Sequence, residues 1–256
     1  MAKYAGVSLI LISFPVFLSI SFLHLNLAFS LLSSISFWFG LALLVFPGFS
    51  QGKYYWIAFG SYFLYHSILY SLVLGLLEPG GVRYLNTIGQ VHFGYGFEVP
   101  PPPAFFPYWV SQSPAVWLIM GSYEADIVPY SVFMGVLLGN LMGLNVNSIL
   151  ELNGLRHTSG LGKTLIALPT IGVISGASCC LALPTIILYS VALSVPALSS
   201  SILLVLSSSS YFLFVYYGLP VLSALALAFN LRVISRAVES CRFKVEGGGA
   251  RVGKIS

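Results

Sequence analysis

The chain of 256 residues is 57% hydrophobic and only 7% charged, with a formal net charge of +4. This charged fraction is far below the roughly 25% of ordinary soluble domains, which excludes a water-soluble globular fold. Together with a mean hydropathy of +0.93, it predicts an integral membrane protein. Several apolar stretches approach the roughly 20 residues that a helix needs to cross the hydrocarbon, so we expect an all-α, polytopic fold rather than a barrel.

The distribution of basic residues predicts the orientation of the chain. All of its lysines and arginines except Arg83 fall in segments that we place on one side of the membrane. Because basic residues are enriched in cytoplasmic loops, we expect a multi-pass protein of the cell membrane with both termini in the cytoplasm. We divide it into a transmembrane domain, residues 1–231, and a basic cytoplasmic tail, residues 232–256. The tail should lie on the anionic inner surface and be partly disordered.

We expect about six transmembrane helices, of which the first three cover residues 4–23, 27–46 and 54–77. The third carries His66 near its middle, with Tyr62 one helical turn away on the same face. An ionisable side chain at this depth is a candidate functional group, because even a neutral imidazole needs a hydrogen-bond partner there. The alternative is a neutral histidine bonded to a tyrosine or to a backbone carbonyl. We therefore treat His66 and Tyr62 as a candidate intramembrane polar site.

Residues 78–126 form the longest segment without the character of a membrane span. They contain an uninterrupted run of prolines, Pro100 to Pro103, and an aromatic string from Phe105 to Trp109. Prolines favour a stiff, extended backbone, and aromatic side chains suit the membrane interface or the surface of a partner. We expect this extracytoplasmic loop to fold over the membrane or to dock another subunit.

The fourth predicted span, residues 127–150, carries a stripe of glycines. Gly135, Gly139 and Gly143 recur at every fourth residue and therefore lie along a single helical face. Such a face allows a second helix to approach closely, and that helix belongs either to this chain or to another. Asn140, Asn145 and Asn147 add amides near the inner end of this span, and we expect them to hydrogen-bond across helices.

The second half of the chain has no charged residue between Lys163 and Arg232 and is interrupted by prolines. The simplest division is two long, kinked spans, residues 164–195 and 198–232. Splitting each into two shorter helices also returns the chain to the cytoplasm, so charge does not decide between these topologies. Broken helices near the membrane centre form the binding sites of many transporters, but kinking prolines are also common in helices that transport nothing.

A run of small residues with adjacent cysteines, Ser-Gly-Ala-Ser-Cys-Cys-Leu-Ala-Leu-Pro, occupies positions 175–184. Pro184 removes the hydrogen bond to the carbonyl of Cys180, and the resulting break would let the sulfurs of Cys179 and Cys180 face one ligand. A disulfide between them is disfavoured, because adjacent Cα atoms lie about 3.8 Å apart and disulfides usually span roughly 4.4 to 6.8 Å. The dithiol therefore suits a soft metal ion or thiol exchange. The alternative is that both cysteines pack as small buried side chains.

This run resembles the first membrane helix of the bacterial mercuric-ion transport membrane proteins. The resemblance covers residues 175–184 and implies that Cys179 and Cys180 receive a metal ion from outside the cell. If a helix begins at Lys163, the pair lies roughly 24 Å along it, in the outer half of the membrane.

We therefore expect a multi-pass membrane protein that binds or moves a thiophilic metal ion through this intramembrane dithiol. An alternative is a non-catalytic subunit of a larger membrane complex, for example a respiratory one, and a second alternative is a membrane thiol-redox protein. We find no nucleophile beside a plausible base, so enzymatic activity is not expected. The expected partners are the lipid bilayer and other membrane subunits or a second copy of the chain, with no nucleic acid. A soft metal ion is the only cofactor that the residues suggest.

Overall fold

The computed structural model describes residues 2–23, 26–69, 89–94, 102–120, 123–155 and 183–252. The helices, in chain order, are α1 (Ala2–Leu23), α2 (Asn26–Val45), α3 (Lys53–Leu64), the π-helix η1 (Tyr65–Leu69), the 3-10 helix η2 (Pro103–Phe105), α6 (Phe106–Gln112), α7 (Pro129–Leu155), α9 (Leu183–Ser194), α10 (Pro196–Leu206), α11 (Ser209–Leu213), the π-helix η3 (Phe214–Gly218) and α12 (Leu219–Val252). The strands are β1 (Gln90–Gly94), β2 (Ala115–Met120) and β3 (Tyr123–Ile127). The described part of the chain is thus mostly helical.

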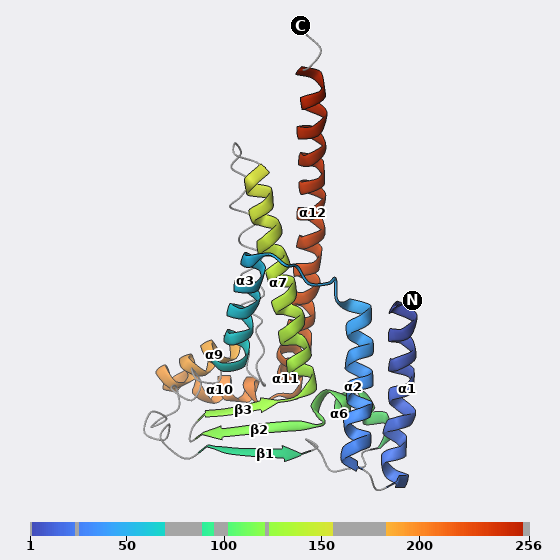
Figure 1. Ribbon diagram of the computed structural model, residues 1–256. Helices are drawn as coiled ribbons and strands as arrows, with labels where there is room; N and C mark the ends of the chain where they lie inside the picture. The colour runs from blue at the N-terminus through green and yellow to red at the C-terminus, as the bar shows by residue number, and fades with distance from the viewer. Residues whose placement is uncertain are drawn as a thin grey trace.

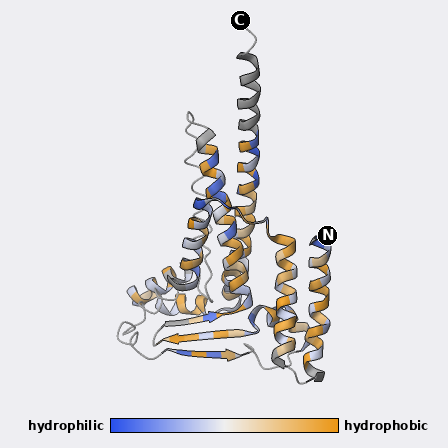
Figure 2. Cartoon of the chain, in the orientation of Figure 1, coloured by the Kyte–Doolittle hydropathy of each residue, from blue (hydrophilic) through white to orange (hydrophobic). Residues whose placement is uncertain are grey.

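Four stretches among the described residues are long and apolar enough to cross a membrane. They are Lys3–Ile20, Ala28–Val45, Pro129–Leu152 and Ser209–Glu239. The long helices run side by side, and the strands gather at the end opposite to the chain termini (Figure 1). Hydrophobic residues predominate along α1 and α2, whereas hydrophilic residues appear toward the C-terminal parts of α7 and α12 (Figure 2). These helices support the prediction of a helical membrane protein. The described residues contain four candidate spans, fewer than the six or so that we predicted.

The predicted span 198–232 is wrong in its boundaries. The chain leaves the helix after Leu206 and enters α11 at Ser209, so the candidate span begins there instead. The cause is local, because the hydroxyl of Ser208 accepts a hydrogen bond from the backbone N–H of Tyr211 at 3.3 Å and caps the new helix. α9 and α10 lie across the direction of the long helices (Figure 1). The predicted span 164–195 falls mostly outside the described residues.

The C-terminal tail also differs from the expectation. We expected residues 232–256 to be partly disordered on the membrane surface, but α12 continues as one helix to Val252. At about 1.5 Å per residue, its 34 residues extend roughly 50 Å. This length exceeds the roughly 30 Å of hydrocarbon, so the helix projects well beyond the membrane. Figure 1 shows this projection beyond the other helices.

α7 is the central helix of the bundle. In its candidate span 67% of the residues are buried inside the protein, compared with 28% in the spans of α2 and α12. It lies between α3 and α12 (Figure 1). The main core cluster consists of Tyr62, Tyr130, Met134, Leu137, Leu138, Leu141, Met142, Tyr216 and Leu227.

Buried amides join α7 to its neighbours, as the sequence predicted for Asn140 and Asn145. The amide nitrogen of Asn230 donates to Oδ1 of Asn145 at 2.7 Å, which links α12 to α7. Oδ1 of Asn140 accepts a hydrogen bond from the hydroxyl of Tyr55 at 2.7 Å, which links α7 to α3. All four side chains are buried, and hydrogen bonds of this kind between membrane helices stabilise one arrangement of the bundle.

The segment between α3 and α7 contains a three-stranded antiparallel sheet in the order β1-β2-β3, which the all-α prediction did not anticipate. Because alternate strand residues point to opposite faces, the register sorts the side chains into two groups. The positions on one face are mostly apolar and include Val91, Phe93, Val116, Leu118, Ala125 and Ile127. The other face includes Gln90, His92, Trp117 and Asp126. The alternation of Tyr-Glu-Ala-Asp-Ile in β3 was the local signal for this strand.

α6 fastens the α1–α2 hairpin to the rest of the bundle. Trp109 and Val110 of α6 are buried against Phe17 and Ile20 of α1. The indole nitrogen of Trp38 in α2 also donates to the carbonyl of Val110 at 2.9 Å. The hairpin is therefore held at its outer end by aromatic packing and a hydrogen bond.

Candidate functional site

The glycine stripe of α7 faces α3 of the same chain. A Cβ at Gly135 would lie 2.6 Å from Cδ2 of His66, and one at Gly143 would lie 2.6 Å from Cδ2 of Tyr55. At Gly139 the same atom would lie 3.2 Å from Cδ2 of Phe59. Contacts under about 3 Å leave no room for a side chain, so the glycines allow the rings of α3 to lie directly on the backbone of α7.

His66 lies in this contact between α3 and α7 and is only 3% exposed. Its Nε2 donates a hydrogen bond to the backbone carbonyl of Ser131, at a distance of 3.0 Å. The ring stacks on Tyr62 with a centroid separation of 6.0 Å and an interplanar angle of 25°. This hydrogen bond agrees with the alternative interpretation of His66, a neutral histidine bonded to a backbone carbonyl.

The remaining ring nitrogen of His66 is the unusual group. A carbonyl only accepts, so Nε2 carries the proton of the neutral imidazole and Nδ1 is an acceptor. Since the Cδ2–Nε2 edge faces Gly135 and Ser131, the Nδ1 side faces away from α7. Nδ1 is buried and has no hydrogen-bond partner among the described residues, and the same is true of the Tyr62 hydroxyl. Unpaired buried polar atoms are uncommon, which makes this pair a candidate binding site.

The orientation of His66 is compatible with a metal ligand as well as with a structural role. Histidines that bind metals almost always donate the other ring N–H to a carboxylate, a backbone carbonyl or water, which fixes the tautomer and the ring orientation. His66 makes such a bond through Nε2 and leaves Nδ1 for a ligand. It also lies in the π-helical turn Tyr65–Leu69, and such turns occur often at functional sites.

The cysteines of the predicted site, Cys179 and Cys180, lie outside the described residues. Pro184, which we expected to break their helix, is the second residue of α9. The first turn is a position that tolerates proline, because its N–H has no partner within the helix. Among the described residues, no group of three or more His, Cys, Asp or Glu side chains could hold a metal ion. A metal site in this chain therefore needs ligands from the part that is not described.

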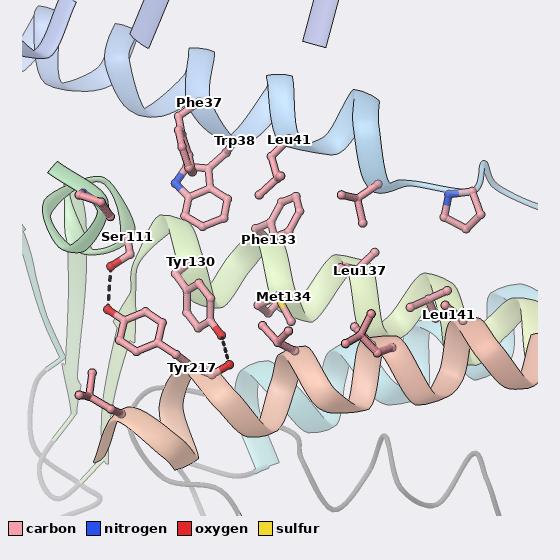
Figure 3. A pocket seen from close by; sticks show the side chains of 18 of the residues that line it. Phe37, Trp38, Leu41, Ser111, Tyr130, Phe133, Met134, Leu137, Leu141 and Tyr217 are labelled. Atoms are coloured by element: carbon pink, nitrogen blue, oxygen red, sulfur yellow. Dashed lines mark hydrogen bonds between the residues drawn. The ribbon is translucent and has the colours of Figure 1, made fainter. Parts of the chain in front are cut away.

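A second candidate site is a cavity of about 780 Å³ between α2, α7 and α12 (Figure 3). Ring and aliphatic side chains line it almost completely. At the end near α6, the hydroxyls of Ser111 and Tyr217 hydrogen-bond at 2.8 Å, and the hydroxyl of Tyr130 donates to the carbonyl of Tyr217 at 3.3 Å. At the other end the lining includes Arg232. Binding sites for small molecules typically have this size and apolar character with a few polar groups.

Trp38 and Phe133 divide this cavity from a smaller one of about 450 Å³, since both residues line both cavities. Their ring centroids lie 4.9 Å apart. The sequence analysis did not find these residues, because the cavity is assembled from three helices and no single segment carries its pattern. The aromatic run around Trp38 in α2 is the local signal that could have indicated it.

Comparisons with known proteins found no matching family model, no matching curated protein and no matching solved structure. A function for this chain is therefore argued from its own residues.

Proposed function

We propose that this chain is a multi-pass membrane protein that binds a thiophilic metal ion at Cys179 and Cys180, with Nδ1 of His66 as a third ligand. The observation that carries the proposal is the orientation of His66, whose Nε2 bonds the Ser131 carbonyl while the buried Nδ1 has no partner in the described part of the chain. Two thiolates and an imidazole form a ligand set for soft and borderline ions such as Cu(I) or Hg(II).

The positions of the described helices support this combination of ligands. α9 follows Cys180 by three residues in the sequence, and it lies at the end of the molecule where α3 ends (Figure 1). His66 belongs to the turn that continues α3 toward this end. The chain also leaves the helix on both sides of α10, and discontinuous helices form the binding sites of many transporters. Passage of the captured ion through the membrane is the corresponding activity.

A titration of the purified, reduced protein with Cu(I) tests the proposal. We expect stoichiometric binding that is lost in the Cys179→Ser/Cys180→Ser variant and retained in Cys241→Ser. His66→Gln keeps an amide donor for the Ser131 carbonyl but has no Nδ1, so we expect weaker binding without loss of the fold. The control is His92→Gln, because His92 is exposed on the outer sheet. Unchanged Cu(I) affinity in the double serine variant would remove the proposal.

A second candidate function, a non-catalytic subunit of a membrane complex, is favoured by the exposed apolar face of the sheet. Val91 is 56% exposed and Phe93 is 80% exposed. β3 directly precedes the candidate membrane span of α7. β1 is separated from β3 by two strand spacings, or about 10 Å. The interfacial layer on each side of the hydrocarbon is only about 5 to 8 Å thick, which is less than this separation. A protein surface is the better cover for this face.

Purification with intact partners distinguishes this second function. We expect Phe93→Ser to lower the recovery of a stoichiometric copurifying chain. Phe105→Ser is the matched control, because Phe105 is an exposed aromatic residue of the same outer segment outside the sheet. A stable monomer without any copurifying chain would contradict the subunit function and leave the metal proposal untouched.

A further inference from the structure

The cavity between α2, α7 and α12 is long and narrow. Along α12 it extends from Tyr217 to Arg232, which is about 22 Å at 1.5 Å per residue. Its floor is α7, with α2 on one side and α12 on the other (Figure 3). Leu137 and Leu141 line the floor, and Ala228 lines the wall formed by α12. These dimensions suit an extended hydrocarbon chain better than a compact ligand.

At the end near α6, the described hydroxyls of Ser111, Tyr130 and Tyr217 are not free to donate to a polar head group. The hydroxyl of Ser111 donates to the carbonyl of Tyr108 at 2.6 Å. The hydroxyl of Tyr217 therefore donates to Ser111 in their shared bond of 2.8 Å, and the hydroxyl of Tyr130 is used by the Tyr217 carbonyl. Because these protons already have acceptors, this end favours the apolar terminus of an occupant.

The opposite end carries a positive charge. Arg232 lines the cavity, is exposed, and forms no ion pair with any described carboxylate. It stands where α12 passes from apolar residues to its basic C-terminal part, the level of the cytoplasmic head groups in the predicted orientation. A guanidinium matches the geometry of a phosphate, and the cytoplasmic leaflet is rich in anionic lipids.

We infer that this cavity binds one anionic phospholipid of the cytoplasmic leaflet, with its phosphate on Arg232 and one acyl chain extended toward Tyr217. Lipid tails are as apolar as the leucines of the cavity, so moving a chain from the bilayer into it gives little selectivity. Selectivity for the lipid therefore comes from the contact between its phosphate and Arg232. The inference does not depend on the metal proposal, because His66, the described member of the proposed ligand set, is not among the described residues that line the cavity.

Quenching of tryptophan fluorescence by brominated lipids tests the inference. Trp38 lines the cavity, so the difference in quenching between the native protein and Trp38→Phe isolates its signal. In detergent we expect brominated phosphatidylglycerol to quench Trp38 saturably and at lower concentration than brominated phosphatidylcholine. Arg232→Gln should weaken the phosphatidylglycerol effect about fivefold, as expected for one arginine–phosphate contact. Arg236→Gln, one turn further along α12 and outside the cavity lining, should leave it unchanged.

A variant that fills the cavity provides an independent check. Ala228→Phe should abolish the saturable component, whereas Ala226→Phe, on the same helix but outside the lining, should retain it. Circular dichroism and size-exclusion chromatography establish that both variants are folded. Equal quenching by both lipids with no effect of Arg232→Gln would identify non-selective boundary lipid and overturn the inference. Protection of Trp38 from both lipids would overturn it as well, because a protein segment would then occupy the cavity.

Discussion

Nε2 of His66 lies 3.0 Å from the backbone oxygen of Ser131 and connects the end of α3 to the first turn of α7. The two residues are 65 positions apart in the sequence, and the bond orients the imidazole within a buried contact between helices. Gly135, one turn beyond Ser131, leaves the space that the ring occupies. One hydrogen bond and one missing side chain thus determine where the other nitrogen of His66 points.

Gly135→Ala should destabilise the protein and displace His66. The new Cβ would lie 2.6 Å from Cδ2 of the ring, so either the helices separate or the imidazole moves. Overpacking of this kind typically costs about 1 to 3 kcal/mol. Thermal unfolding in detergent measures the loss. The control is Gly60→Ala on α3, where a Cβ meets nothing within 4 Å and stability should be equal or slightly higher. Equal stability of the two variants would contradict the packing described.

The pair of Asn145 and Asn230 should be energetically coupled. Asn230 donates to Asn145 at 2.7 Å, and Asn145 donates to the carbonyl of Leu227 on the same neighbouring helix. In a double-mutant cycle of Asn145→Ala and Asn230→Ala we expect a coupling of about 0.6 kcal/mol, and at most about 1.7 kcal/mol. Denaturation in mixed micelles provides the four free energies of unfolding. Strict additivity would show that the bond contributes nothing to the stability of the bundle.

Trp38→Ala should release the α1–α2 hairpin from α7. The change removes the hydrogen bond to the Val110 carbonyl and the contact with the ring of Phe133. Truncation of a large buried aromatic side chain typically costs about 3 to 5 kcal/mol, and this one is only partly buried, so we expect the lower end of that range. Proteolysis of the connection between α2 and α3, residues 46–52, should become faster. The control is Phe39→Ala, because Phe39 is a neighbouring aromatic residue that is exposed. Protease should cut this variant at the same rate as the native protein.

The predicted orientation places the sheet outside the cell and the connection between α2 and α3 inside. In a variant with Cys179, Cys180 and Cys241 replaced by serine, Phe93→Cys should react with a membrane-impermeant maleimide in intact cells. Ser50→Cys should react only after the cells are opened. The physical reason is the bias of basic residues toward the cytoplasm, which Lys53 follows at the start of α3. The reverse labelling pattern would show that the chain has the opposite orientation in the membrane.

The helical membrane class was predictable because it depends on composition, with so few charged residues that water is not a suitable solvent. The boundaries in the second half were less predictable. Ser208 ends one helix and caps the next through a bond of its own side chain, and serine is equally compatible with a continuous membrane helix. The sheet was missed because its strands of five and six residues are short, and short apolar runs do not distinguish strand from helix.

The sequence alone determined that the chain is a helical membrane protein, that one face of residues 129–155 admits a close neighbour, and that the amides on that helix need partners. These properties depend on residues near one another in the chain, through composition and helical periodicity. Only the tertiary structure decided that α3 is the neighbour, that His66 bonds Ser131, and that α2 encloses an apolar cavity with α7 and α12. Each of these is a contact between distant segments, and helix packing in lipid selects among many apolar surfaces that are locally equivalent.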